Sequence, residues 1–414
     1  MIIFQIFLIL TLLFMAFTLM PFWRYEAWWV RVLDFPRMQI FLLGMLLFLL
    51  ELAVLDLSQP ATWGLLTVIL LCLIILTWWI IPYTRLYPVE VQSAENADPR
   101  NSIGILTANV LTPNRNVDGL IDIVRESRPD VFVTLESDGW WQSKLDVLES
   151  EYRYTIKYPL DNLYGMHMYS KLPISESRIE FLVEDDVPSI HTTIRLPSGN
   201  KIRIHFLHPA PPSPNENDGS SERDAELVIV ARIVAESELP EIVAGDLNDV
   251  AWSATSRLFK KISGMLDPRV GRGMYNTFHA DYWFMRWPLD HLFHSNHFTL
   301  SRIQRLRGFG SDHFPLFTKL VYAEGHELIQ EGLEADAADL AWAEKKLETQ
   351  GIGKSDIPPG FTKLNDSTES AGVFVVQSYP ADSRQKVEKA VMEQRIEIRA
   401  SPAVHQGDGV GFAV

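Results

Sequence analysis

Three long stretches with almost no charged side chains dominate the beginning of the chain. Residues 1–22 and 61–81 contain no charged residue, and residues 38–55 contain only Glu51. Each stretch is close to the roughly 20 residues that a helix needs to cross a bilayer. The ends of the stretches carry the aromatic residues typical of a membrane interface, namely Trp23, Trp28, Trp29, Trp78, Trp79 and Tyr83. We therefore expect residues 1–82 to be a three-helix, multi-pass anchor in the plasma (inner) membrane.

The arginines near these stretches bear on the orientation of the anchor. Arg24, Arg31 and Arg37 lie between the first and second stretches, and Arg85 follows the third. With three crossings, that loop and the rest of the chain lie on one side, and the positive-inside rule places both in the cytoplasm. Because long domains cross regardless of a few arginines, the side of the catalytic domain stays open. The only cysteine, Cys72, lies in the third stretch, so the remainder forms no disulfide.

After the anchor, the pattern changes to short apolar runs separated by polar segments. We expect a linker over residues 83–100, an α/β domain over 101–322 and an acidic C-terminal extension over 323–414. In the domain, strands are predicted at 103–108, 130–135, 166–169, 190–196, 201–207, 241–244, 289–293 and 314–321, and helices at 120–128 and 224–236. In the extension, we expect an acidic helix over 328–347 and a small β-α-β unit from 372–377, 383–394 and 396–399.

The overall charge constrains the partners of the chain. It contains 52 acidic and 37 basic residues, a formal net charge of −15. A protein that binds nucleic-acid phosphates without sequence preference usually presents a basic face. Here only local clusters are basic, namely Arg269 with Arg272, and the run Arg302, Arg305 and Arg307. The composition therefore gives no support for non-specific nucleic-acid binding.

The segment EIVAGDLND, residues 241–249, is the first candidate for chemistry. A short apolar run leads to Gly245, which lets the backbone turn so that Asp246 and Asn248 project from the strand end. The carboxylate can polarise a water while the amide stabilises a phosphoryl oxygen. Because glycine, aspartate and asparagine are also common turn formers, this motif alone does not establish a catalytic site.

Similar polar residues stand at the ends of other predicted strands. These are Asn109, Glu136, His208, Asp290, Asp312 and His313. Glu136 with Asn109 and Asp312 offers the oxygen ligands that Mg²⁺ prefers, with Mn²⁺ or Ca²⁺ as alternatives. His313 can take a proton from water if Asp290 holds its other ring nitrogen. Each residue alone is better explained by a solvated strand end, a hydrogen-bonded loop or a turn, but their recurrence at strand ends indicates one metal-dependent site.

The segments TLES, GMHMYSKLPI, FLHP, GDLND, PLDHLF and GSDHFPL together resemble the endonuclease/exonuclease/phosphatase superfamily over residues 101–320. The resemblance implies a four-layer α/β sandwich, two packed β-sheets flanked by helices. It implies a role for each candidate: Glu136 as principal metal ligand beside Asn109 and Asp312, His208 at the substrate phosphate, Asp246 and Asn248 orienting water and stabilising the transition state, and Asp290 supporting His313. His208 replaces the tyrosine of abasic-site enzymes, and TANVL lacks an aromatic neighbour found in some nuclease branches, which argues against DNA repair.

Three functions are consistent with these features. The first is a membrane-anchored, nuclease-like phosphodiesterase. In its three spans followed by this domain, the chain also resembles a group of bacterial membrane proteins, which favours an integral-membrane hydrolase and leaves the substrate open. The second is a lipid phosphodiesterase of the sphingomyelinase type or an inositol-phosphate phosphatase. The third is a catalytically silent scaffold, against which the completeness of the polar set speaks. We expect substrate choice to depend on the loops at 209–217 and 270–287.

Overall fold

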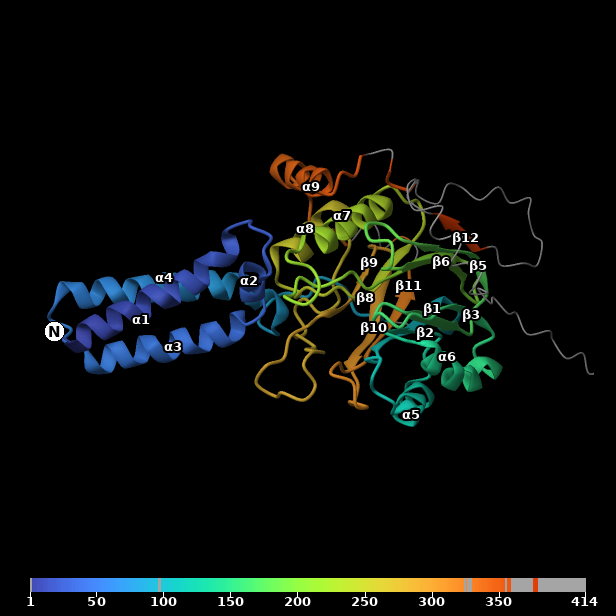
Figure 1. Ribbon diagram of the computed structural model, residues 1–414, viewed down its shortest axis with the longest axis horizontal. Coiled ribbons are helices and arrows are strands. Elements are labelled where there is room, and N and C mark those ends of the chain that lie inside the picture. Colours follow the sequence, from blue (N-terminus) through green and yellow to red (C-terminus); the bar gives the residue numbers. More distant parts are fainter. Residues whose placement is uncertain are drawn as a thin grey trace, which may run out of the picture.

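The computed structural model describes residues 2–95, 98–323, 325, 330–353, 356–358 and 375–378. An elongated bundle of three helices leads into an α/β domain (Figure 1). The bundle contains α1 (Ile2–Leu19), α3 (Arg37–Val54) and α4 (Pro60–Ile80). All three are long and apolar enough to cross a membrane, which confirms the expected helices. Their outer surface is apolar, as Leu42 and Leu43 illustrate with exposed fractions of 59% and 63%.

The first sheet of the domain has six strands in the order β10-β11-β1-β2-β4-β3. Its strands are β1 (Ser102–Asn109), β2 (Val131–Leu135), β3 (Tyr154–Tyr158), β4 (Met166–Ser170), β10 (Phe298–Arg305) and β11 (Leu316–Tyr322). Only β1 and β2 pair in parallel, because α5 (Val117–Ser127) connects them as a crossover. The helix α6 (Gly139–Leu145) follows β2, and both helices cover the outer face through a cluster that includes Leu120, Phe132 and Trp141.

The second sheet has the order β12-β5-β6-β7-β8-β9. Its strands are β5 (Ile174–Glu180), β6 (Ser189–Arg195), β7 (Lys201–Leu207), β8 (Glu241–Asp246), β9 (Asp290–His294) and β12 (Val375–Ser378). The expected hairpin of β6 and β7 is confirmed, with Arg195 opposite Lys201 next to the turn. Outside this sheet lie α7 (Ser221–Ala235) and α8 (Ala254–Ser263), and α9 (Ala337–Thr349) packs on α7 and α8.

The two sheets face each other across one continuous core. Ile105 and Val133 of the first sheet and Ile204 and Ile242 of the second belong to the same buried cluster, and all four are fully buried. The layers are therefore helices, sheet, sheet and helices, the four-layer sandwich predicted above. The strands β3, β5 and β10 and the helices α6 and α8 were not predicted.

Two expectations outside the sandwich need comment. The predicted acidic helix starts too early, because residues 330–336 are not helical and α9 begins after Asp336, whose carboxylate caps it in a capping box with Asp339. Of the predicted β-α-β unit, the structure describes only residues 375–378, as β12; the rest lies outside the described residues. The expected linker contacts the domain, since Val91 is fully buried in the core between the sheets and Glu90 pairs with Lys260 at 2.8 Å.

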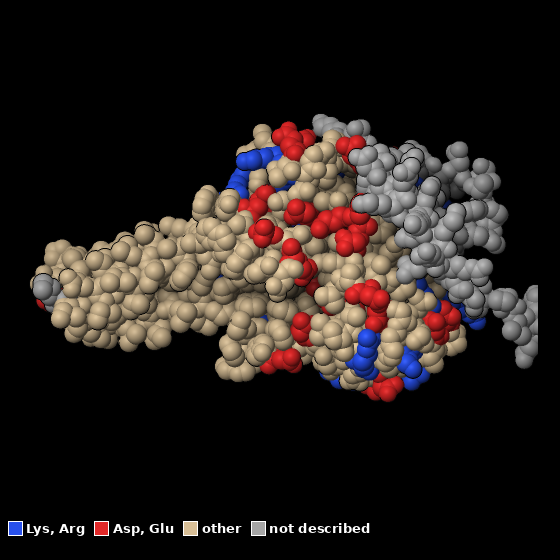
Figure 2. All heavy atoms as spheres, in the orientation of Figure 1, with Lys and Arg blue, Asp and Glu red and all other residues tan. Residues whose placement is uncertain are grey.

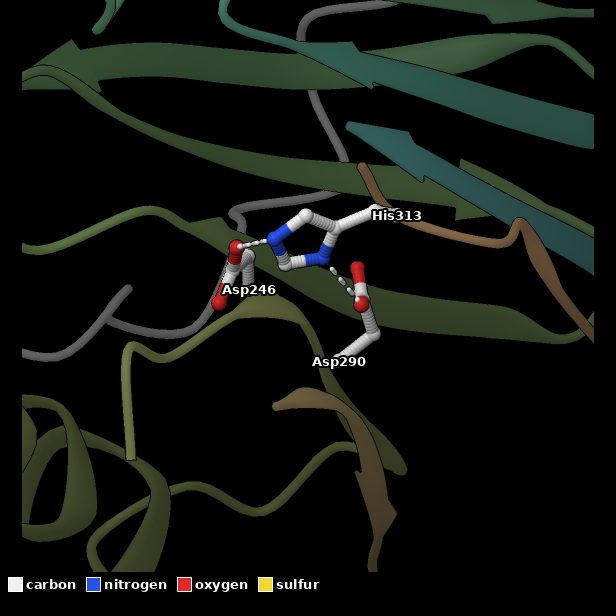
Figure 3. Close-up of side chains that lie close together, drawn as sticks. All are labelled: Asp246, Asp290 and His313. Atoms are coloured by element: carbon white, nitrogen blue, oxygen red, sulfur yellow. Dashed lines mark hydrogen bonds and ion pairs between the residues drawn. The ribbon is translucent and has the colours of Figure 1, made fainter. Parts of the chain in front are cut away.

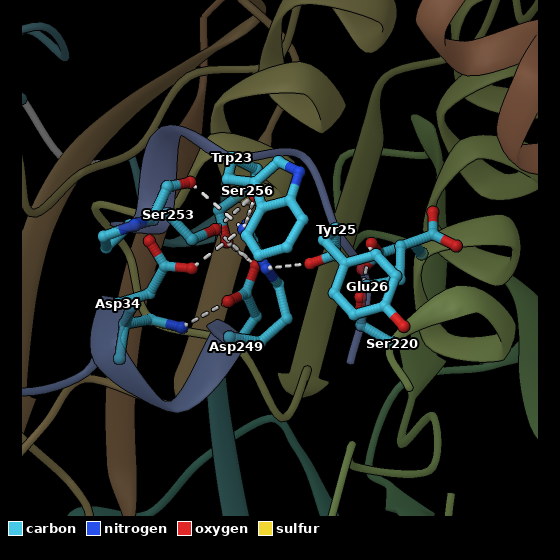
Figure 4. A network of polar contacts seen from close by, with 12 residues as sticks. Trp23, Tyr25, Glu26, Asp34, Ser220, Asp249, Ser253 and Ser256 are labelled. Carbon is cyan, nitrogen blue, oxygen red and sulfur yellow. Dashed lines mark hydrogen bonds and ion pairs between the residues drawn. The ribbon is translucent and has the colours of Figure 1, made fainter. Parts of the chain in front are cut away.

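The first loop of the anchor is packed against the domain through buried polar groups (Figure 4). Arg31 pairs with Asp34 at 3.3 Å, and the carbonyl of Asp34 accepts a 2.8 Å hydrogen bond from the Trp252 indole. Glu26 pairs with Lys346 of α9, which also pairs with Asp224 of α7 at 2.6 Å. Arg31 is only 5% exposed, so its charge serves the junction between anchor and domain.

Candidate active site

Strand geometry explains why distant polar residues meet between the two sheets. Alternate residues of a strand face the same side, so residues four apart point in the same direction. This spacing connects an inward-facing isoleucine to a polar residue in three places: Ile105 to Asn109 in β1, Ile204 to His208 after β7, and Ile242 to Asp246 in β8. Asp290 of β9 stands directly opposite Asp246 in the antiparallel pair. The core pattern therefore continues into a polar site at one end of the sandwich.

His313 lies between two of these carboxylates (Figure 3). Its Nδ1 is 2.8 Å from Oδ2 of Asp290, and its Nε2 is 3.4 Å from Oδ2 of Asp246. The Ser311 hydroxyl accepts the backbone N–H of His313 at 3.0 Å, and the Phe278 ring lies 4.9 Å from the imidazole. The predicted contact between Asp290 and His313 is therefore present, and the ring orientation is fixed from all sides.

Glu136 and Asn109 also meet, as expected from the strand-helix-strand order. Asn109 donates its side-chain N–H₂ to Oε1 of Glu136 at 2.8 Å and to Oδ2 of Asp246 at 3.3 Å. Its Oδ1 accepts the N–H of Leu111 at 3.0 Å. In this arrangement Asn109 joins two carboxylates through its amide nitrogen, and its role as an oxygen ligand stays a prediction.

The remaining predicted residues surround this centre. His208 Nε2 lies 4.0 Å from Oδ2 of Asp246. Asn248 donates to the Pro209 carbonyl at 2.9 Å, and its backbone N–H donates to Asp246 at 3.0 Å, so its amide is positioned at the edge of the site. Asp312 is half-buried beside His313, and its carboxylate acts on the pKa of both Glu136 and His313. The structure thus brings all eight predicted residues to one region.

Burial and charge act in opposite directions on the two histidines. Burial lowers the pKa of His208 to about 4, only partly opposed by Asp246, so His208 is neutral at pH 7. Burial also lowers the pKa of His313, but the carboxylates of Asp246 and Asp290 outweigh it and raise this pKa to about 10. The two carboxylates therefore favour the imidazolium form of His313, which donates hydrogen bonds from both ring nitrogens.

Two features of Glu136 fit a hard divalent cation. Burial raises its pKa to about 7, opposed by the hydrogen bond from Asn109 and reinforced by Asp312. Its Oε2 is buried and has no hydrogen-bond partner among the residues that the structure describes. Ligand atoms of Asp246, Asp290 and His313 also lie within 4.8 Å of one another, but the 2.8 Å contact between Asp290 and His313 is a hydrogen bond rather than a pair of ligands. Glu136 with Asp312 is the better ligand set.

Several supporting residues were not predicted. Thr277 accepts the backbone N–H of Asp290 at 3.2 Å, and Ser311 donates to the Asn109 carbonyl at 2.8 Å. Arg269 is buried, pairs with Asp267 and donates to the Asp290 carbonyl at 3.2 Å. Arg223 donates to the Asn248 carbonyl at 2.6 Å. Ser311 stands inside a quoted motif, whereas nothing in the local sequence distinguishes the two arginines from solvated ones.

The chain is similar to a known protein family and to several solved structures. A family model described as "Endonuclease/Exonuclease/phosphatase family" matches residues 106–313. Solved structures that resemble the chain include a humanized TDP2 from D. rerio, with 17% identity, a TM-score of 0.44 and coverage of 53% of this chain and 99% of that one. The human Nocturnin catalytic domain with bound sulfate gives 15% identity, a TM-score of 0.45 and coverage of 55% and 96%. A search of the curated proteins gave no significant match.

The family match includes every candidate residue of the site and spans just over half of the 414 residues. The chain therefore belongs to the endonuclease/exonuclease/phosphatase family.

Proposed function

We propose that the domain hydrolyses phosphodiester bonds with the help of a divalent cation, with Mg²⁺ first and Mn²⁺ or Ca²⁺ as alternatives. The main support for this proposal is the position of His313, which is buried between the carboxylates of Asp246 and Asp290. Asn109 connects Asp246 to Glu136. A cationic ring and an acidic pair in one buried space suit a reaction in which a water is activated while a phosphoryl group gains negative charge. A silent scaffold gives no reason to bury these charges together.

In the proposed reaction, a water oxygen forms a bond to phosphorus as the bond to the leaving oxygen breaks. Asp246 takes the proton of the water, because its carboxylate faces the space beside His313. His313, held charged by Asp290, and the neutral His208 donate hydrogen bonds to the phosphoryl oxygens. Asn248 donates to the same group from the edge of the site. This assigns the base to Asp246 rather than to His313, because the pKa of His313 is raised to about 10.

The proposed cation is held by Glu136 and Asp312, with Asn109 beside them. When bound, a divalent cation neutralises phosphate charge and polarises the P–O bond. Glu136 supplies the unpartnered Oε2 for this purpose, and Asn109 keeps Glu136 at a fixed position next to Asp246. The residues that position the water and the phosphate are therefore separate from those that hold the cation.

The proposed location is the plasma (inner) membrane, with three crossings. The support is the length and apolar surface of α1, α3 and α4. Arg31 and Arg37 are buried at the junction between anchor and domain, so they carry little weight in a count of topogenic charges.

A direct test uses the full-length protein in detergent with bis(p-nitrophenyl) phosphate as substrate. We expect hydrolysis that requires Mg²⁺ or Mn²⁺, stops in excess chelator and falls at least about 100-fold in Asp246→Asn. Asp146→Asn is the matched control. Asp146 lies on η5 (Asp146–Ser150), away from the site, and pairs with Lys157. This substitution should leave the rate unchanged. Full hydrolysis by Asp246→Asn, or no hydrolysis of any phosphodiester by the wild type, would refute the proposal.

A further inference from the structure

The loop before β9 carries a group of large apolar side chains that the core does not use. Tyr282, Trp283, Phe284 and Met285 are consecutive, with exposed fractions of 50%, 80%, 54% and 41%. We call residues 282–285 the aromatic tip. Soluble surfaces rarely expose several large apolar residues in a row, and such a patch usually contacts another apolar partner.

The aromatic tip lies beside the membrane anchor. The side chain of Gln39 donates a 2.9 Å hydrogen bond to the Phe284 carbonyl, and Gln39 belongs to the first turn of α3. The uncharged part of α3 begins at this turn, so the tip lies at the depth where the apolar surface of the span starts. In Figure 1 this loop, coloured gold, lies next to the domain end of α3. Figure 2 shows an uncharged protrusion at the same place.

Other exposed aromatic residues lie at the domain end of the helix bundle, where α1 ends and α3 begins (Figure 1). Trp23, Tyr25 and Trp29 follow the end of α1, pack on one another and are 58%, 50% and 43% exposed. Tryptophan and tyrosine favour the boundary between hydrocarbon and head groups. The aromatic tip therefore continues the apolar surface of the anchor, and a lipid bilayer is the partner that fits both.

The base of the same loop forms a wall of the active site. Phe278 contacts the His313 ring at 4.9 Å, and the backbone N–H of Ala280 donates to the Asp312 carbonyl at 2.7 Å. On the membrane side, Trp287 packs edge-on against Phe35 of the first anchor loop at 5.8 Å. Phe278 at the wall of the site and Trp283 in the aromatic tip are therefore only five positions apart in the sequence.

A cation stands between the tip and the site. Arg286 lies over the ring of Phe314 at 5.0 Å, the residue after His313, and Arg305 lies over the same ring at 4.5 Å. Arg286 is half-buried, and its Nη2 donates to the Ala280 carbonyl at 2.9 Å. A positive charge in the segment that joins the tip to the wall of the site suits a phosphate that approaches from the bilayer.

We propose that the aromatic tip inserts into the head-group layer and that the substrate is the phosphodiester of a membrane phospholipid. This inference rests on the proposed function and names its substrate class. The net charge of −15 supports it, because an acidic protein gains little from a polyanion such as nucleic acid, whereas apolar insertion does not need a basic surface.

The test compares full-length wild type with Trp283→Ser/Phe284→Ser in vesicles of phosphatidylethanolamine and phosphatidylglycerol. Two rates are measured, release of soluble phosphorylated product from lipid and hydrolysis of added bis(p-nitrophenyl) phosphate. We expect the double variant to lose about tenfold or more of the lipid rate while its rate on the soluble diester stays within about twofold of wild type. Val147→Ser is the control, because Val147 is 58% exposed on η5, away from the anchor, and should change neither rate.

Insertion itself is measured separately from turnover. In a Cys72→Ser background, which removes the only cysteine, Trp283→Cys and Val147→Cys carry an environment-sensitive fluorophore. We expect blue-shifted emission and quenching by lipid-borne quenchers only for the label at 283. A wild type that hydrolyses bis(p-nitrophenyl) phosphate and RNA or DNA but no lipid, or a label at 283 that reports water, would overturn this inference and leave the proposed function standing. No turnover of any diester would refute the proposed function instead.

Discussion

Replacing Asp290 with asparagine should slow turnover without weakening substrate binding. Asp290 is fully buried and contacts His313, so it has no access to substrate. Asparagine preserves the shape but removes the charge that, together with Asp246, keeps His313 protonated. When the amide nitrogen faces Nδ1, this ring nitrogen accepts a hydrogen bond and carries no proton, so the ring loses its charged form.

The size of the effect follows from the geometry. Opposite charges about 4 Å apart interact by about 4 kcal/mol at an effective dielectric constant of about 20. If a fraction of this stabilisation is needed only as charge develops on the phosphoryl group, kcat falls about 100- to 1,000-fold. The free energy of unfolding should fall as well, because the variant loses the charge that faces His313 at 2.8 Å in the folded state.

The assay measures kcat, KM and the unfolding midpoint on one preparation of full-length protein. Asp130→Asn is the control, since Asp130 accepts the Gly104 N–H at 2.7 Å at the opposite end of β2 from Glu136. That variant should keep kcat, because asparagine can still accept the Gly104 N–H and Asp130 does not contact His313. An Asp290→Asn protein with a lowered midpoint and kcat within about threefold of wild type would refute the reasoning, because Asp290 would then be only structural.

Three further variants test the packing around the site. Burial, with Glu184 nearby, raises the pKa of Glu226 to about 8, so the folded state keeps a proton that the unfolded state releases above about pH 4.5. The contribution of Glu226 to stability is therefore greatest below pH 4.5 and falls as the pH rises to 8. Glu226→Gln should gain up to a few kcal/mol over wild type at pH 8 but not at pH 4.5, measured by denaturant unfolding. Lys346→Met leaves Asp224 and Glu26 without this cation and should cost about 3 kcal/mol, read from the thermal midpoint. Gly245→Ala places a Cβ 1.9 Å from the Leu207 carbonyl at φ +145° and should abolish soluble expression or cost more than about 3 kcal/mol; a normal midpoint would contradict the strain argument.

Local patterns were sufficient for much of the fold. The hairpin of β6 and β7 was predicted because its alternation is regular and its turn contains proline and glycine. The strands β5 and β10 were missed, because ISESRIE and FTLSRIQR place charged residues at outward positions and dilute the apolar signal. The helix α9 was placed too early, because residues 330–336 share its acidic composition while Gln330 instead bonds the carbonyls of Asn296 and Phe298 at 2.9 Å.

The site was predictable to the extent that it depends on strand ends. Asn109, His208 and Asp246 continue the alternation of inward-facing residues along their strands. This alternation can be read from the sequence. The charge state of His313 could not be predicted, because it depends on two carboxylates that only the paired strands β8 and β9 bring to it. Contacts between the first anchor loop and the domain could not be predicted either. Glu26 and Lys346 are 320 residues apart, and in the sequence each is indistinguishable from a charged residue on the surface.

The central claim is that Glu136 binds a divalent cation on which phosphodiester hydrolysis depends. The most direct test titrates Mn²⁺ into metal-free full-length protein and follows bound Mn²⁺ by electron paramagnetic resonance and hydrolysis of bis(p-nitrophenyl) phosphate in the same samples. We expect hydrolysis to rise in proportion to bound Mn²⁺. Glu136→Gln should lose both Mn²⁺ binding and hydrolysis. Glu149→Gln is the control, because Glu149 is a half-buried glutamate on η5, and it should keep both. Hydrolysis at the wild-type rate without bound metal, or in Glu136→Gln, would contradict the central claim.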